Sequence, residues 1–421
     1  METIPIGYKQ TKVGVIPEDW DIVIFDRLKD TTVSHSITGG PFGSNLKSEH
    51  YTKEGVRIIQ LQNIGDGVFI NNDFIYTSEE KATELKTCLI YPDDIILAKM
   101  AEPVARACLI PRIENKFLMG SDGIRLHVDK TKYNNKFILE SINYERFRKI
   151  AIARSTGSTR QRIGLSDLKT IPIAIPPLKE QQKIAKILTT WDNAISKQDE
   201  LIKDKEELKK GLMQKLLNAE VRFSGFSNEW EQKKTSYFML ERNIKTPKSK
   251  EYPLMAFVAY KGVTNKGDRY NREFLVNDEN NKKYKQTEYG DFIYSSNNLE
   301  TGSIGLNRYG SATISPVYSV FKITGSCDYN FINSLLLTKS FINKMIRYRQ
   351  GVVYGQWRIH ESDFLKIKVR LPHLDEQQKI AKVLTNADKE IDILKSELEE
   401  LKKQKKGLMQ KLLTGKVRVK V

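Results

Sequence analysis

The chain of 421 residues is long enough for two or more domains, each with its own hydrophobic core. A mean hydropathy of −0.47, no apolar run of the roughly 20 residues needed to span a bilayer, and no signal-peptide pattern predict a cytoplasmic protein without membrane contact. Three cysteines without a C-x-x-C pair and five scattered histidines argue against disulfides and metal sites.

The net charge of +17 favours a polyanionic partner, and nucleic acid is the commonest one for a cytosolic protein. The charge is unevenly distributed along the chain. Residues 21–160 carry 20 basic and 18 acidic side chains, whereas residues 223–358 carry 20 basic and 12 acidic ones. The first block therefore needs a local basic face if it is to bind DNA.

In chain order, an N-terminal segment (1–20) precedes a first block of mixed α/β character (21–160) and a helical spacer (161–222). A second such block (223–358) and a second spacer (359–421) follow. Short β-like runs punctuated by Gly, Asn and Asp indicate strands in both blocks. Each block ends in an expected helix and a basic loop with glycine: helices at Phe137–Ala153 and Phe331–Tyr348, loops at Ala153–Arg162 and Arg347–Arg358.

The two spacers are an internal repeat. The string EQQKIAK occurs at Glu180–Lys186 and Glu376–Lys382, and 20 of the 38 positions from Glu180 and from Glu376 are identical without a gap. Similarity upstream is weaker but extends into the blocks. A duplicated chain has to be explained before any other feature of its fold.

Each repeated segment is expected to be one long helix. Apolar residues recur with alternating steps of four and three from Ile184 and from Ile380, which is the coiled-coil period. Prolines mark the entry into each helix. A helix of about 38 residues is roughly 57 Å long, enough to separate two DNA-reading modules; a plain dimerisation coil is the competing interpretation.

The basic loops contain the candidate DNA-contacting residues, because Arg and Gln pair bidentately with guanine and adenine while small residues contact phosphates. Arg162 and Arg358 occupy matching positions and either anchor the loop or bind phosphate. The candidates are Arg154, Arg160, Gln161 and Arg162 in the first block, Arg347, Arg349, Gln350, Tyr354, Gln356 and Arg358 in the second, and, in weaker loops, Lys47, Lys261, Lys266 and Arg269.

Catalytic signatures are mostly missing. There is no phosphate-binding G-x-x-x-x-G-K-[ST] loop, no dinucleotide fingerprint and no Asn-Pro-Pro-aromatic string. Asp93, Asp94 and Lys99 weakly suggest nuclease carboxylates, but the second acidic residue of that pattern is missing. A nuclease or methyltransferase with an unrecognised site, and a coiled-coil adaptor that binds proteins, are the competing assignments.

Two variable blocks, each followed by a helix that opens with P-x-L-x-E-Q-Q-K-I-A-K and closes with K-G-L-M-Q-K-L-L, resemble the specificity subunit of type I restriction-modification systems. The resemblance covers essentially the whole chain. It implies an α+β protein with two target recognition domains, each reading half of a bipartite, asymmetric DNA sequence. It also implies that the two helices form an antiparallel coiled coil with pseudo-twofold symmetry.

The resemblance further implies that this chain is not itself catalytic. Two modification subunits would bring S-adenosylmethionine and methylate adenines, and restriction subunits would bring ATP, Mg and cleavage. The polar residues at the start of each helix are expected to be available for capping or for docking the modification subunits. These residues are Glu180, Gln181, Gln182 and Lys183 in the first copy and Glu376, Gln377, Gln378 and Lys379 in the second.

Overall fold

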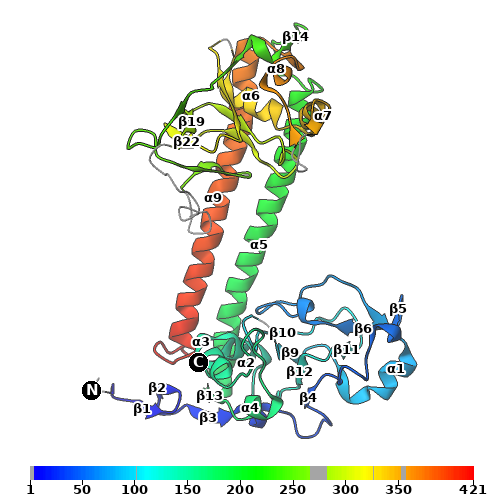
Figure 1. Cartoon of the computed structure of the whole chain (residues 1–421). Helices are drawn as coiled ribbons and strands as arrows, with labels where there is room; N and C mark the ends of the chain where they lie inside the picture. Colours follow the sequence, from blue (N-terminus) through cyan, green and yellow to red (C-terminus); the bar gives the residue numbers. More distant parts are fainter. Residues whose placement is uncertain (1–3, 101, 266–281, 326, 352–356) are drawn as a thin grey trace. The chain divides into compact units, whose positions relative to one another are not determined.

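The computed structural model describes residues 4–100, 102–265, 282–325, 327–351 and 357–421. It divides into two compact units: unit 1 comprises Met1–Asp199 and Glu397–Val421, and unit 2 comprises Glu200–Ser396. Each unit contains one of the variable blocks together with one part of each long helix (Figure 1). The predicted α+β class is confirmed.

Unit 1 contains two larger sheets. An antiparallel sheet has the strand order β10-β9-β12-β4, and a second sheet has the order β5-β7-β6-β11-β8, in which β6 and β11 are parallel. The strands of these sheets are β4 Ile37–Gly39, β5 Tyr51–Thr52, β6 Val56–Ile59, β7 Tyr76–Thr77, β8 Leu89–Ile90, β9 Ile95–Ala98, β10 Ala107–Leu109, β11 Phe117–Met119 and β12 Gly123–Leu126.

Unit 2 repeats the first of these sheets. Its antiparallel four-stranded sheet has the order β21-β20-β23-β15, so that β20 and β23 occupy the central places held by β9 and β12 in unit 1. A smaller sheet has the order β16-β19-β22. The strands are β15 Met239–Glu241, β16 Lys245–Thr246, β19 Tyr284–Thr287, β20 Phe292–Tyr294, β21 Ile304–Leu306, β22 Ala312–Ile314 and β23 Ser319–Ile323. The duplication therefore extends from the helices into the variable blocks.

Two further strand pairs connect the blocks to the spacers. In unit 1, β3 (Asp21–Ile24) pairs antiparallel with β13 (Pro172–Ile175), just before a long helix begins. In unit 2, β14 (Glu231–Lys234) pairs in the same way with β26 (Lys368–Leu371). Unit 1 also has an N-terminal hairpin, formed by β1 (Tyr8–Thr11) and β2 (Gly14–Pro17).

The prediction of one helix near the end of each block is wrong, because each is a pair of short helices. Unit 1 has α2 (Asn135–Asn143) and α3 (Glu145–Ala153), separated by Tyr144, whose backbone is extended. Unit 2 has α6 (Tyr329–Leu336) and α7 (Lys339–Ile346). There the break follows from an N-cap: the Thr338 hydroxyl accepts a hydrogen bond from the Phe341 amide, as threonine does at helix starts.

The two long helices are α5 (Leu178–Leu217) and α9 (Leu374–Leu412). They are antiparallel in each unit. In unit 1, Gln198 donates to Glu397 at 3.1 Å and Lys405 contacts Asp192 at 2.5 Å. In unit 2, Lys205 contacts Glu390 at 2.6 Å and Lys209 pairs with Asp388.

The predicted apolar ladders form the seam of this coiled coil. Their side chains are buried or half-buried in both helices. The ladders also enter the cores at both ends: Ile184 and Leu188 of α5 pack with Leu412 of α9 and with α2 in unit 1. Ile380 of α9 packs with Leu216 of α5 and with α6 in unit 2. The antiparallel coiled coil implied by the family resemblance is confirmed.

Candidate nucleic-acid interface

The first basic loop, Ala153–Arg162, is a short loop whose two ends are joined by backbone hydrogen bonds. The amide of Thr156 donates to the carbonyl of Arg162 at 3.0 Å, and the reverse bond measures 2.9 Å. Gly157 has a φ of +101°, and a Cβ atom there would lie 2.7 Å from the Arg160 carbonyl oxygen. Glycine is therefore required for this turn, which leaves Arg160 and Gln161 exposed.

The other two arginines of this loop hold it to the domain. Arg154 donates to the Asp167 carbonyl at 3.1 Å and to the Thr170 hydroxyl at 2.5 Å, and Arg162 forms an ion pair with Asp122. By contrast, the Arg160 side chain has no ion-pair or hydrogen-bond partner among the residues that the structure describes. Of the four predicted contact residues, Arg160 and Gln161 are exposed, whereas Arg154 and Arg162 contact their own domain. Base contact by Arg160 and Gln161 stays a prediction.

The second basic loop shows the same division of roles. Arg349 is 10% exposed and forms a bidentate pair with Glu300, with both N···O distances at 2.6 Å. Arg358 lies 3.8 Å from Glu361 and pairs in register with Gln350 across the short strands β24 (Gln350–Gly351) and β25 (Trp357–Arg358). Arg347 and Gln350 are exposed. Tyr354 and Gln356 lie outside the described residues.

Arg162 and Arg358 thus have similar surroundings as well as matching sequence positions. Each is about half exposed, and each is paired with a carboxylate of its own unit. An arginine whose charge is already paired is better suited to anchoring a loop than to reading a base. This geometry favours the anchoring role for both residues.

The weaker candidates are on exposed turns. Lys47 is exposed and lies 3.6 Å from Glu49. Lys261 is exposed in the turn between β17 (Ala256–Val258) and β18 (Gly262–Thr264). Lys266 and Arg269 lie outside the described residues.

Exposed aromatic side chains near these loops were not among the predicted residues. Phe42 is 82% exposed, Tyr260 is 82% exposed and Trp357 is 50% exposed. Aromatic side chains on a nucleic-acid-binding surface can stack on unpaired bases. Phe42 precedes a turn in which the Asn45 amide donates to the Phe42 carbonyl at 2.8 Å. Its position between Pro41 and Gly43 was a sequence signal of an exposed turn.

Asp94, considered above as a nuclease carboxylate, is enclosed by its own domain. Its side chain is fully buried and accepts from Arg125 at 2.7 Å, and it contacts the imidazole of His127 at 2.6 Å. Its counterpart in unit 2, Asp291, is likewise paired with Arg242 at 2.6 Å. Burial raises the pKa of Asp291, with Arg242 acting in the opposite direction. Both carboxylates directly precede a central strand of the four-stranded sheets, β9 or β20, and these ion pairs have a structural role.

The prediction that the first two residues of each EQQK string are open to a partner is wrong. Glu180 and Gln181 are each 1% exposed. Glu180 accepts from the Trp20 indole at 3.2 Å and from Arg418 at 2.8 Å. Gln181 donates to the Pro176 carbonyl at 2.9 Å and accepts from the backbone amide of Asn134, the N-cap of α2, at 2.9 Å.

The second copy repeats these contacts. Glu376 is buried and accepts from Arg222 at 2.9 and 2.7 Å. Gln377 is buried, and its side-chain amide donates to the Pro372 carbonyl at 2.9 Å. The side-chain oxygen of Gln377 accepts from the backbone amide of Asp328, the N-cap of α6, at 3.1 Å. The repeated Glu-Gln pair therefore fixes each long helix to its own domain. The carboxylate and amide groups of these side chains are already hydrogen-bonded within the unit.

Each buried glutamate is paired with an arginine from the opposite copy of the repeat. Arg222 follows α5 and Arg418 follows α9, at positions 196 residues apart, which is the offset of the repeat. Copy-one Glu180 binds copy-two Arg418 in unit 1, and copy-two Glu376 binds copy-one Arg222 in unit 2. Antiparallel helices produce this exchange, because the start of one lies beside the end of the other.

The second half of each string differs. Gln182, Lys183, Gln378 and Lys379 are exposed. Lys379 lies over the Phe226 ring, 4.9 Å from its centroid. For these four residues, docking of a partner subunit stays a prediction.

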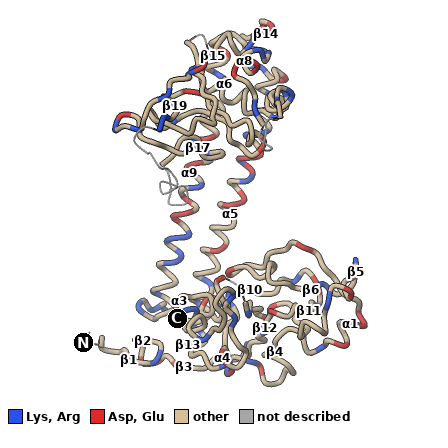
Figure 2. Tube along the Cα trace, in the orientation of Figure 1, with Lys and Arg blue, Asp and Glu red and all other residues tan. Residues whose placement is uncertain are grey.

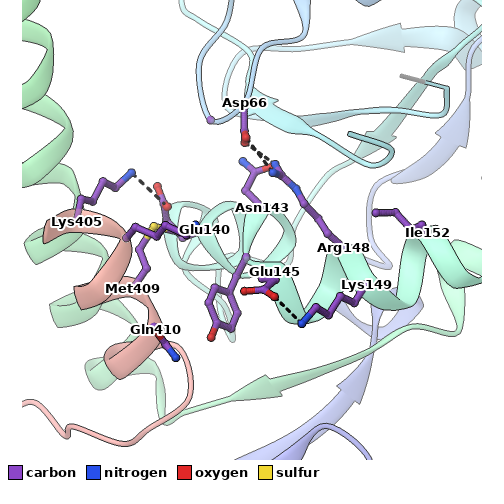
Figure 3. Close-up of a pocket in the computed structure, with 13 residues that line it drawn as sticks. Asp66, Glu140, Asn143, Glu145, Arg148, Lys149, Ile152, Lys405, Met409 and Gln410 are labelled. Carbon is purple, nitrogen blue, oxygen red and sulfur yellow. Dashed lines mark hydrogen bonds and ion pairs between the residues drawn. The ribbon is translucent and has the colours of Figure 1, made fainter. Parts of the chain in front are cut away.

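Charged residues of both signs are distributed along α5 and α9 (Figure 2). One charged cluster is half-buried in unit 1: Lys136 contacts Glu140 at 2.5 Å and Asp192 at 2.7 Å, and Lys405 contacts the same two carboxylates. Figure 3 shows Lys405 pointing toward Glu140. Both residues line a cavity of about 590 Å³ between α2, α3 and the end of α9. Lys405 interrupts the apolar ladder, and these ion pairs compensate for its burial.

This cluster predicts a pH dependence of stability. Burial alone would raise the pKa of Asp192, but hydrogen bonds from Lys136 and Lys405 lower it below its usual value. The resulting stability is fully present above the ordinary aspartate pKa of about 3.9 and is lost as the pH falls through the lower pKa of the folded state. The melting-temperature difference between wild type and Asp192→Asn should therefore shrink on acidification below about pH 4. Calorimetry can measure it, with the exposed Asp392→Asn as control; a difference that grows on acidification contradicts the assignment.

No helix among the described residues is long and apolar enough to cross a membrane. In the same part of the chain, no group of three or more His, Cys, Asp or Glu side chains is arranged to hold a metal ion.

A family model for the type I restriction modification DNA specificity domain matches residues 46–206 and 227–403, one match in each half of the chain. The chain belongs to the type I restriction-modification specificity family. A relative in this family, the putative type I restriction enzyme MjaX specificity subunit of Methanocaldococcus jannaschii, is 26% identical over 98% of this chain and 97% of its own length. The MjaIX specificity subunit of the same organism is 24% identical over 98% and 96%.

Solved structures share the fold of this family. The S subunit of a type I restriction-modification system from M. genitalium superposes with a TM-score of 0.55 at 19% identity, covering 93% of this chain and 96% of that one. A chain from a study of complex assembly in the type I R-M system gives a TM-score of 0.54 at 12% identity, covering 96% and 99%. The duplicated fold of this specificity-family member is therefore shared with distant relatives.

Proposed function

We propose that this member of the specificity family is the DNA-recognition subunit of a type I restriction-modification complex. Residues 21–160 and 223–358 are its two target recognition domains, and each reads one half of a bipartite, asymmetric DNA target. The paired helices act as the spacer that sets the number of unread base pairs between the half-sites.

One repeated arrangement carries this proposal. Both units contain a four-stranded sheet of the same order, a pair of short helices, and a basic loop held by arginine–carboxylate pairs. In both, the loop exposes an arginine and a glutamine: Arg160 and Gln161 in unit 1, Arg347 and Gln350 in unit 2. These side chains are the commonest bidentate readers of guanine and adenine. Because the two loops differ in sequence, the two half-sites are expected to differ.

The chemistry belongs to the partners in this proposal. Two modification subunits dock on the exposed polar positions of the helices, bind S-adenosylmethionine and methylate adenine at N6. Restriction subunits bring ATP-dependent translocation and cleavage with Mg. This chain contributes sequence recognition and geometry, and it works in the cytoplasm, where the DNA is.

The DNA contact can be tested with two arginines of the same loop. Replacing Arg160 with alanine should weaken binding of the methylated target by about 5- to 150-fold, which corresponds to the loss of one bidentate base contact of roughly 1–3 kcal/mol. The matched control is Arg162→Ala, whose guanidinium is already paired with Asp122 and should contribute less to DNA affinity. Fluorescence anisotropy of the chain assembled with its modification subunits measures both.

The same titration separates this proposal from its competitors. Affinity should fall steeply with added salt, because phosphate contacts release counterions. Absence of DNA binding by the assembled complex would instead favour an adaptor that contacts proteins alone. Binding of S-adenosylmethionine by this chain on its own would favour a methyltransferase.

A further inference from the structure

A groove in unit 2 is larger than its counterpart in unit 1. It has a volume of about 710 Å³ and lies between the start of α7, residues 368–370 of β26 and the end of α5. The counterpart in unit 1 lies between the start of α3, residues 172–174 of β13 and the end of α9, and measures about 20 Å³. Each residue that lines the small cavity has an equivalent in the lining of the large one. The offset is 196 for Leu413 and for residues 172–174. It is 194 for the lining residues of α2, α3 and the residue between them, counted from the matching N-caps Asn134 and Asp328. The duplication thus produced the same surface twice, and only one copy is filled.

The N-terminal hairpin covers this surface in unit 1. Val13 and Ile16 of the hairpin are buried in the core that contains Leu413. The Tyr8 hydroxyl donates to the Gly415 carbonyl at 2.8 Å, and Gly14 approaches Arg146. Among the described residues, unit 2 has no counterpart of β1 and β2, because residues 218–230 lead from the end of α5 to β14 without forming a strand. A segment of polypeptide is therefore what this surface accommodates where it is covered.

The residues at one repeated position, shortly after each long helix, differ between the covered and the uncovered surface. Gly415 and Ala219 are repeat equivalents and share a left-handed backbone, with φ of +70° and +59°. A Cβ atom at Gly415 would lie 2.4 Å from Cδ of Pro17 in the hairpin, so only glycine fits under that cover. Alanine is accommodated at the equivalent place in unit 2, where no hairpin lies over it.

Trp230, which lines the unit 2 groove, provides an independent sign of a missing contact. Trp20 is its unit 1 equivalent, because each tryptophan directly precedes the strand that pairs with β13 or β26. Trp20 donates its indole N–H to Glu180 at 3.2 Å. The indole N–H of Trp230 is buried but has no hydrogen-bond partner among the described residues. An unpaired buried donor is unfavourable, and an acceptor supplied from outside would remove that penalty.

The charge of the groove restricts the occupant. Lys344, Lys368 and Arg370 are exposed basic residues of its lining. Arg222 is neutralised by Glu376, and Glu229 is the one acidic side chain of the described lining. The hairpin of a second copy would bring Lys9 and Lys12 to this surface, so like charges disfavour it. An acidic segment has the complementary charge.

We propose that the unit 2 groove binds an acidic hairpin or extended segment of a partner protein, in the manner in which unit 1 binds its own N-terminal hairpin. In the part of the chain that the structure describes, this site is open in unit 2 and covered by the hairpin in unit 1. It is therefore distinct from the repeated surfaces that two modification subunits require, and it does not depend on DNA recognition. The partner segment would cover in unit 2 the surface that the N-terminal hairpin covers in unit 1.

The N-terminal hairpin supplies the probe. Its ends meet, because the Glu18 amide donates to the Gly7 carbonyl at 2.9 Å, so residues 7–18 can be cyclised head to tail. The acidic probe carries Lys9→Glu and Lys12→Glu, and the unchanged cyclic peptide is its comparison. The full chain should bind the acidic peptide at least ten-fold more tightly than the unchanged one in a calorimetric titration.

Two matched variants locate the binding. Lys368→Glu with Arg370→Glu reverses the rim of the groove and should weaken binding of the acidic peptide at least ten-fold, without changing the melting temperature. Lys382→Glu with Lys389→Glu makes the same charge change on the exposed face of α9 and should leave binding unchanged. Failure of the acidic peptide to bind, equal binding of both peptides, or binding that survives the rim reversal overturns the proposal. Loss of DNA affinity in the rim variant also overturns it and assigns the surface to nucleic acid.

Discussion

Replacing Arg418 with methionine should destabilise unit 1 by about 1–3 kcal/mol, because the buried Glu180 carboxylate loses its partner charge while the Arg418 side chain is itself 39% exposed. Glu180 is 1% exposed and receives two hydrogen bonds from Arg418, so the substitution leaves a buried carboxylate with only the Trp20 indole as donor. Hydrogen exchange on peptides covering residues 4–28 and 413–421 measures the effect in the intact chain. Protection equal to that of the wild type would contradict it.

Two variants establish the cause. Arg418→Met combined with Glu180→Met removes both charges and should recover most of the loss, because no unpaired carboxylate is left in the core. Arg222→Met is the matched control, since it removes the equivalent partner of Glu376. Its loss of protection should appear in unit 2 and leave unit 1 unchanged.

Lengthening both long helices by one heptad should widen the gap between the two methylated half-sites by about three base pairs. Seven helical residues add roughly 10 Å, and base pairs are spaced at about 3.4 Å. Each insertion point adjoins a residue that is paired across the seam within its own unit: Gln198 contacts Glu397 in unit 1, and Lys395 contacts Glu206 in unit 2. A heptad keeps the apolar ladder in phase. Sequencing of methylated adenines gives both half-sites and the gap.

The control is an insertion in one helix only. It shifts the apolar ladder of α5 relative to that of α9, so pairs such as Lys209 with Asp388 are separated and methylation should be lost. Altered half-sites with an unchanged gap in the double insertion would show that the helices do not set the spacing.

The periodic features of this chain could be predicted from the sequence. The offset of 196 residues, the long helices and their apolar ladders follow from local spacing, since a helix places every third or fourth residue on one face. The break at Thr338 was missed because a threonine within an apolar-basic run is read as helix interior unless its capping role is recognised.

The candidate site was harder to predict. Arginines of one loop look alike in sequence, yet Arg349 is enclosed by Glu300 and Arg347 is exposed. The carboxylate that distinguishes them lies 49 residues away in the chain. Tertiary contacts of this kind leave no local signal.

The repeated string EQQKIAK illustrates both what the sequence determined and what only the tertiary structure decided. By itself the sequence determined that the chain is duplicated, where the paired helices begin, and that Ile184 and Ile380 start their apolar faces. Only the tertiary structure decided that Glu180 and Glu376 are buried, because the arginines that neutralise them come from the opposite copy of the repeat. A buried carboxylate requires a partner charge, and here antiparallel folding supplies it from a segment more than 150 residues away.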